Sequence, residues 1–245
     1  MDHLLLFIVL ALLAEILGTV GGFGSSLFFV PIAGYFLDFH AVLGVTAVFH
    51  VSSNVSKLFL FRDGFNRKLL LTMGLPAVIF VIIGAWMSAF FDARWLELIL
   101  SLFLIVMSLS FLFRPTFTLK ANTSNAVGGG ILSGFAAGLL GTGGAIRGIA
   151  LSAFGLSKSV FIATSAWIDL GIDGSRAIVY YFNGYILKEN LYLVPILLGV
   201  SLCGSWMGKL VLQQISEILF RKIVLLLILL TGLITLGRSI YLNGL

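Results

Sequence analysis

The sequence predicts an all-α protein that crosses a membrane many times, with about eight to ten membrane helices in two related halves. Hydrophobic residues make up 60% of the 245 positions and charged residues only 10%, whereas soluble domains are about half apolar and about a quarter charged. The mean hydropathy is +1.13. A soluble fold of this size has too little polar surface to cover so many apolar residues, so we expect the lipid bilayer to surround the chain.

Charge and cysteine content narrow the classes of partner. The formal charge is +5, but Lys and Arg lie mostly between apolar segments, where cytoplasmic loops collect them. We therefore expect no nucleic-acid partner. Cys203 is the only cysteine, which argues against a disulfide framework and a thiolate metal site. The first apolar segment lacks the basic start and cleavage site of a secretory signal, so we interpret it as a retained helix.

Ten apolar segments are expected to form helices. A helix needs about 20 apolar residues to cross the roughly 30 Å hydrocarbon core. The second and seventh segments are too short to cross unaided, and each follows a glycine cluster. Short, glycine-interrupted segments at matching places in two halves are typical of the broken helices of transporters. The segments are 4–20, 25–37, 41–61, 71–91, 96–113, 127–140, 145–155, 158–182, 191–214 and 220–242.

The two halves align with each other. Residues 18–37 align with 138–157, and three glycines of each stretch fall in register. Residues 43–57 align with 162–176, and three polar residues of each stretch coincide at a constant offset of 119 positions. These pairs are His50 with Asp169, Asn54 with Asp173, and Lys57 with Arg176. We therefore predict a first repeat at 1–113, a cytoplasmic linker at 114–126 and a second repeat at 127–245.

Loop charge predicts how the halves are oriented. Loops 62–70, 114–126 and 215–222 carry Lys and Arg and are expected in the cytoplasm. Loops 38–40, 92–95 and 183–190 are weakly charged and are expected outside. Each half then makes an odd number of crossings. The halves are consequently predicted to be inverted repeats, the architecture that allows a transporter to alternate its opening.

Arg147 stands in an otherwise small and apolar stretch, GTGGAIRGIALSAFG. A charged side chain deep in a bilayer persists when it faces a cavity or a partner. Because Arg147 follows a glycine-flanked helix start, it is placed to bind an anion with its bidentate guanidinium. Two alternatives remain open, a structural ion pair with Asp169 or Asp173 and a position at the membrane interface.

The two glycine clusters are candidate anion-binding elements. Unpaired backbone N–H groups at a helix start attract anions, and glycine lets a ligand approach them. The alternative is that the glycines only allow close helix packing. With Asn54 and Arg147, the predicted substrate-binding residues are Gly21, Gly22, Gly24, Ser25, Ser26, Gly141, Gly143 and Gly144.

The third helix of each half carries a polar stripe on one face, at positions i, i+4 and i+7. Ionisable residues inside a membrane favour a functional role with a partner. These residues either couple transport to protons or form internal ion pairs, and Lys57 and Arg176 are also near enough to the helix ends to reach the interface. The stripes are His50, Asn54 and Lys57, and Asp169, Asp173 and Arg176. Glu15, near Gly18, is a further polar residue of the first helix.

The sequence lacks the signatures of the enzyme classes it superficially suggests. GTGGAIRG is not a phosphate-binding loop, because no G-K-[ST] follows it and no strand precedes it. No His, Cys and carboxylate residues have metal-ligand spacing, and no nucleophile–base–carboxylate set is visible. We therefore expect no catalytic residues, no metal and no cofactor.

The paired motifs GGFGSSLFFVP and GLLGTGGAIRG are each followed by a short apolar run, then by LGVT or IATSA, and then by a polar stripe. This arrangement resembles the TauE/SafE family of membrane permeases over nearly the whole chain. The resemblance implies transport, often export, of sulfite, sulfoacetate or other organosulfonates. Phe23 interrupts a glycine run that family members often keep, and Arg147 follows the second cluster, so the substrate stays open.

The residues and the resemblance agree on a secondary transporter of a small anion, most simply an exporter in a bacterial inner membrane. Two alternatives remain: an anion channel that uses the same residues without alternating access, and a membrane-embedded transferase. The sequence leaves open whether the protein forms a homodimer.

Overall fold

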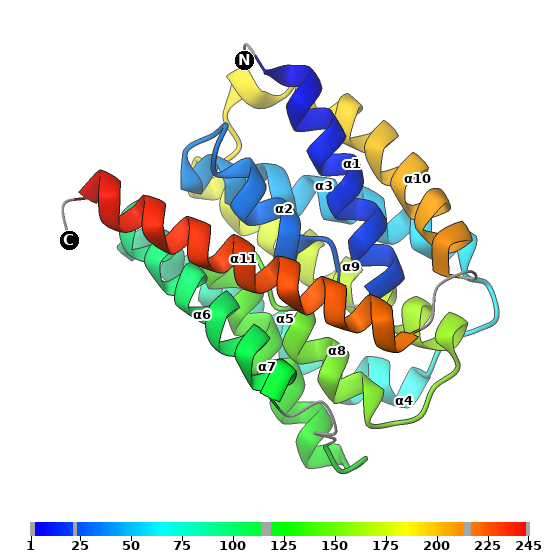
Figure 1. Ribbon diagram of the computed structural model, residues 1–245. Coiled ribbons are helices and arrows are strands. Elements are labelled where there is room, and N and C mark those ends of the chain that lie inside the picture. The colour runs from blue at the N-terminus through cyan, green and yellow to red at the C-terminus, as the bar shows by residue number, and fades with distance from the viewer. Residues whose placement is uncertain (1–2, 22–23, 114–118, 213–216, 244–245) are drawn as a thin grey trace.

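The computed structural model describes residues 3–21, 24–113, 119–212 and 217–243, which form helices and no strand (Figure 1). Each of the ten expected apolar segments corresponds to a helix. The first half contains α1 (Leu4–Gly21), α2 (Ser26–Ala33), α3 (Phe39–Leu60), α4 (Arg67–Leu69), α5 (Leu75–Met87) and α6 (Ala93–Phe113). The second half contains α7 (Thr123–Leu140), α8 (Gly144–Ser152), α9 (Lys158–Phe182), α10 (Leu193–Leu212) and α11 (Glu217–Asn243).

One membrane helix is built from two pieces, because a π-helical turn (Leu70–Gly74) joins α4 to α5. Pro76 lies in the first turn of α5. A proline lacks the backbone N–H and crowds the carbonyl four residues earlier, so the wider π turn accommodates it within a continuous helix.

Two interhelical segments are shorter than the sequence predicts. α7 begins at Thr123, inside the predicted linker, because the Asn122 side chain accepts a hydrogen bond from the backbone N–H of Asn125. α11 begins at Glu217, inside the predicted loop 215–222, where Arg221 and Lys222 are residue types that favour helices. Residues 114–118 of the linker lie outside the described ranges.

The surface of the helix bundle is apolar, as in a protein surrounded by lipid. Leu5, Ile79, Val106, Leu132 and Trp206 each expose more than half of their side-chain surface. A soluble monomer rarely exposes apolar patches of this extent. Among the described residues, five helices are long and apolar enough to cross a membrane: Leu4–Gly21, Phe39–Leu60, Arg67–Phe90, Ala93–Phe113 and Leu193–Leu212. The protein is therefore an all-α, polytopic membrane protein.

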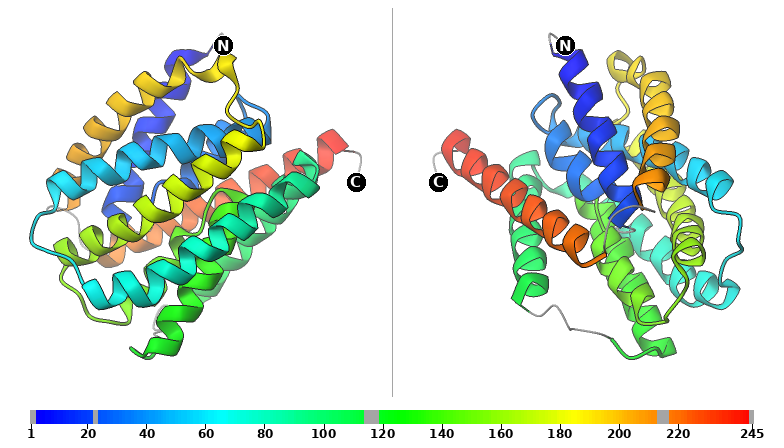
Figure 2. Two further views of the ribbon diagram at one scale, coloured as in Figure 1. Left: turned by 180° about the vertical axis from the view of Figure 1, so that it is seen from behind. Right: turned by 45° about the vertical axis from the view of Figure 1, so that its right-hand side comes forward.

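Helices of the two halves pack as pairs. α1 packs on α10 and α5 on α7, whereas α3 packs on α9 and α6 on α11 (Figures 1 and 2). α3 and α9 run antiparallel, because Asn54 contacts Asp173 while Asn66, just beyond α3, contacts Thr164 near the start of α9. An inverted repeat requires this orientation for corresponding helices. The packing supports the predicted duplication, which itself remains a prediction.

Glycines of α7 bring its backbone into contact with α5 and with the π turn that precedes α5. A Cβ added at Gly130 would lie 2.2 Å from the carbonyl oxygen of Met73. A Cβ added at Gly134 would lie 2.2 Å from the carbonyl oxygen of Ala77. Small residues at such spacing allow membrane helices to approach each other closely. The pair therefore joins the two halves through main-chain contact.

The short helices α2 and α8 contact each other between the two halves. Gly24, just before α2, and Gly141, at the end of α7, have φ values of +84° and +78°, which glycine adopts without steric penalty. The hydroxyl oxygens of Ser26 and Thr142 lie 3.1 Å apart and link the two turns. Gly22, a predicted binding residue, lies outside the described residues.

Candidate functional site

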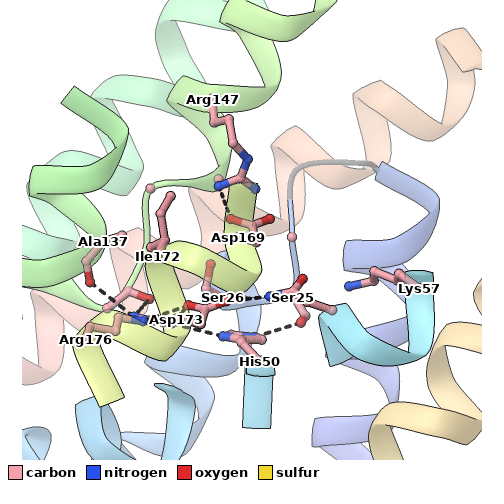
Figure 3. A pocket seen from close by; sticks show the side chains of 15 residues that line it. Ser25, Ser26, His50, Lys57, Ala137, Arg147, Asp169, Ile172, Asp173 and Arg176 are labelled. Atoms are coloured by element: carbon pink, nitrogen blue, oxygen red, sulfur yellow. Dashed lines mark hydrogen bonds and ion pairs between the residues drawn. The ribbon is translucent and has the colours of Figure 1, made fainter. Parts of the chain in front are cut away.

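A pocket lies where the starts of α2 and α8 meet the polar stripes of α3 and α9 (Figure 3). Thirteen of the fifteen residues predicted as binding or coupling residues line it. Gly21 does not line it, and Gly22 is not described. The thirteen are Gly24, Ser25, Ser26, His50, Asn54, Lys57, Gly141, Gly143, Gly144, Arg147, Asp169, Asp173 and Arg176.

Arg147 projects from α8 and forms an ion pair with Asp169 of α9 (Figure 3). Its Nε donates a hydrogen bond to the Ser165 hydroxyl at 3.1 Å. The residue is 2% exposed, so its side chain lies inside the helix bundle. A Cβ added at Gly24 would lie 3.7 Å from Nη2 of Arg147, so this nitrogen faces the turn before α2. Arg147 therefore extends from α8 toward the turn that precedes α2.

Arg176 holds the end of α7 and pairs with Asp173. Its Nη1 donates hydrogen bonds to the carbonyl oxygens of Ala137 and Gly141, at 3.1 Å and 2.8 Å. Its Nη2 lies 2.7 Å from Oδ1 of Asp173, and the Asn54 amide donates to Oδ2 at 2.7 Å. The last carbonyls of a helix lack partners within it, and a cation there is favourable. Arg176 is therefore bonded to groups inside the helix bundle.

Glu15 of α1 is the buried carboxylate that the predicted binding set omits. Its side chain is fully buried, and it pairs with Lys57 of α3 at 2.9 Å. A buried charge requires such a partner and further hydrogen bonds. It accepts hydrogen bonds from four hydroxyl groups, those of Thr19, Ser25, Ser53 and Ser205. Glu15 therefore ties α1 to the start of α2, to α3 and to α10.

His50 lies between the Glu15 and Arg176 clusters, and its partners fix its protonation. Nδ1 lies 3.2 Å from Nη2 of Arg176, and because arginine only donates, Nδ1 accepts and carries no proton. The proton is on Nε2, which donates to the Ser25 hydroxyl at 2.8 Å. Ser25 donates its own proton to Oε2 of Glu15 at 2.6 Å. His50 is therefore neutral, and a continuous chain of hydrogen bonds links the two carboxylate clusters.

The charges of the described residues in and beside the pocket balance. Three buried ion pairs, Glu15–Lys57, Arg147–Asp169 and Asp173–Arg176, contribute three cations and three carboxylates. An anion that enters such a region adds an uncompensated negative charge unless a cation or a proton accompanies it.

Sequence reasoning gave a role to the hydroxyl groups of Ser25 and Ser26 but none to those of Ser165 and Thr142, which bond to Arg147 and Ser26. Many Ser and Thr residues occur in the apolar helices, and only their place in the fold distinguishes Ser165 and Thr142. Glu15 had a visible signal, because an acidic residue within a membrane helix is rare. Its partner Lys57 lies 42 positions away, and no spacing rule connects the two.

The pocket is a buried, charge-paired cavity between two short helices of a membrane protein. The model of the sulfite exporter TauE/SafE family matches residues 7–235, nearly the whole chain. The chain belongs to this family. The resemblance read from the two glycine motifs and the polar stripes is thereby confirmed. A TauE/SafE protein is a multi-pass membrane transporter of the sulfite exporter type, and the helical bundle agrees with that class. No curated protein and no solved structure matches the chain.

Proposed function

We propose that this TauE/SafE protein is a secondary transporter of the bacterial inner membrane that exports sulfite or an organosulfonate. The anion binds between the starts of α2 and α8. The observation that carries the proposal is the position of Arg147, whose Nη2 faces Gly24 across a pocket that both helix starts line. Backbone N–H groups at two helix starts and one guanidinium group suit the oxygens of a sulfonate.

Antiparallel packing of α3 on α9 supports alternating access. Polar residues of the two helices meet in the pocket, where Asn54 bonds to Asp173. In inverted-repeat transporters the substrate site lies at the interface of the repeats, and one repeat rocks against the other. The membrane potential favours export of an anion that crosses without a proton, because the cell is negative inside.

The test is transport by the purified protein in liposomes loaded with labelled sulfite, sulfoacetate, taurine or isethionate. We expect saturable efflux of at least one of these compounds, and counterflow of label against an unlabelled gradient. Counterflow separates a transporter from a channel. In a transporter the binding site can return across the membrane with labelled substrate bound, whereas a channel has no such alternating site. If wild type moves none of the four, the proposed substrate class is wrong.

Arg147→Gln tests the binding site. Loss of a charged hydrogen bond costs about 1.5–3 kcal/mol, so we expect KM to rise roughly tenfold to a hundredfold. The double variant Arg147→Gln/Asp169→Asn removes the ion pair without leaving a buried carboxylate alone, and we expect it to fold and still bind poorly. Arg67→Gln, at an exposed arginine, is the matched control. Wild-type KM in the double variant would show that Arg147 does not hold the substrate.

A further inference from the structure

Asp169 differs from the other two buried carboxylates because only one of its oxygens has a partner among the described residues. Both oxygens of Glu15 and both oxygens of Asp173 accept hydrogen bonds. Asp169 pairs with Arg147 through Oδ1, and no donor among the described residues reaches its Oδ2. Its side chain is 14% exposed, compared with 0% for Glu15 and 8% for Asp173.

Asp169 lies at the boundary of two cavities. Asp169 lines the central pocket and also a neighbouring cavity, which Ile162 and Ser165 line near the beginning of α9. Arg147 likewise has its Nη2 toward the pocket. Both partners of this ion pair therefore line the central pocket.

His50 is a poor proton acceptor in this arrangement. A second ring proton would sit on Nδ1, which already faces a donor nitrogen of Arg176 at 3.2 Å. That proton would remove the hydrogen bond and place a second positive charge beside the guanidinium group. The usual preference for histidine as the proton carrier near neutral pH therefore does not hold here.

We propose that Asp169 takes up one proton when an anion binds Arg147, so that the proton and the anion cross the membrane together. This inference rests on the proposed anion transport. An anion oxygen on Arg147 displaces the Asp169 carboxylate, which is then buried without its counter-ion. A proton on Asp169 offsets one negative charge of the anion and restores the neutral balance of the pocket. Return of the empty site requires Asp169 to release the proton and pair with Arg147 again.

The charges around Asp169 fit this exchange. Lys57 and His50 face it from α3, Arg147 from α8, and Asp173 and Arg176 from its own helix. α5 and α7 pack on α9 and contain no ionisable side chain. Lys57 and Arg176 are bound to Glu15 and Asp173, so neither is free to compensate an incoming anion.

The first experiment needs no variant. Wild type is reconstituted in liposomes that hold labelled isethionate, a sulfonate that remains a monoanion, with a pH-sensitive dye inside. We expect one proton to leave with each isethionate, and efflux that is insensitive to a potassium diffusion potential. Flux without proton movement, or flux accelerated by an interior-negative potential, overturns the inference while the proposed transport stands. If no anion moves in any assay, both proposals fall.

Three variants locate the proton. Asp169→Asn imitates the protonated state, so we expect it to exchange labelled for unlabelled isethionate without proton movement. Its net efflux should fall on the order of tenfold, because the empty site leaves Arg147 buried without a charge partner. Asp173→Asn and His50→Gln are the matched controls, and in each the remaining flux should keep one proton per anion. Coupling that survives Asp169→Asn, or is lost only in a control, overturns the assignment.

Discussion

Asn54 and Asp173 form a hydrogen bond of 2.7 Å, and they are separated by the 119 positions that relate the two polar stripes. Corresponding residues of the two halves therefore meet in the pocket. Asn54→Asp places a carboxylate against Asp173, and both cannot stay ionised at this distance. We expect a lower melting temperature in detergent and loss of transport.

The exchanged pair Asn54→Asp/Asp173→Asn restores one amide and one carboxylate at this contact. We expect it to recover most of the melting temperature that Asn54→Asp loses. A double variant as unstable as Asn54→Asp would show that the two sites are not interchangeable. Asn54 and Asp173 would then correspond in the sequence alignment of the halves but not in their structural roles.

Glu15 and Lys57 should behave as one unit in stability measurements. Removal of one partner of a buried ion pair leaves an uncompensated charge, which costs about 3–5 kcal/mol. We expect Glu15→Gln and Lys57→Met each to lower the melting temperature strongly. The double variant should lose less stability than the two single variants lose together, because no charge remains buried alone. Additive losses would contradict the pairing at 2.9 Å.

The α5–α7 contact predicts a position-specific effect of one methyl group. At Gly134 an added Cβ would lie 2.2 Å from the Ala77 carbonyl oxygen, so the two helices must separate. We expect Gly134→Ala to destabilise the protein by about 1–3 kcal/mol, the usual cost of overpacking. Gly128 lies in the same helix with nothing within 4 Å of its Cβ position. Gly128→Ala should therefore preserve or raise the melting temperature, and equal losses in both variants would argue against this contact.

Most of the helices were predictable because apolar length alone defines a membrane segment. The ten predicted segments fall on ten helices, and the errors lie at their ends, where Asn122 and Glu217 start α7 and α11 early. The first residue of a helix depends on capping and on helix propensity, and the length of an apolar segment gives no information on either. The family was also readable, because the paired glycine motifs occur twice with the same surroundings.

The polar residues of the pocket were predictable in identity but not in their pairing. A charged residue in an apolar segment is conspicuous, so Arg147 and Asp169 were both singled out. Which carboxylate Arg147 contacts depends on how α8 packs on α9, and sequence spacing does not determine that packing. The same reason explains why Glu15 was left without a partner, since it is bound by residues of α1, α3 and α10 and by Ser25 just before α2.

The orientation of the chain in the membrane gives the last prediction. Loop 62–70 is expected in the cytoplasm and loop 183–190 outside, because Lys and Arg favour the cytoplasmic side. In a Cys203→Ala background, we expect Glu189→Cys to react with an impermeant maleimide in intact bacteria. Asp63→Cys should react only after permeabilisation. Both side chains are exposed, so detergent should make both reactive, which controls for access. Reaction of Asp63→Cys in intact cells with protection of Glu189→Cys would reverse the orientation, and the direction of export would have to be assigned again.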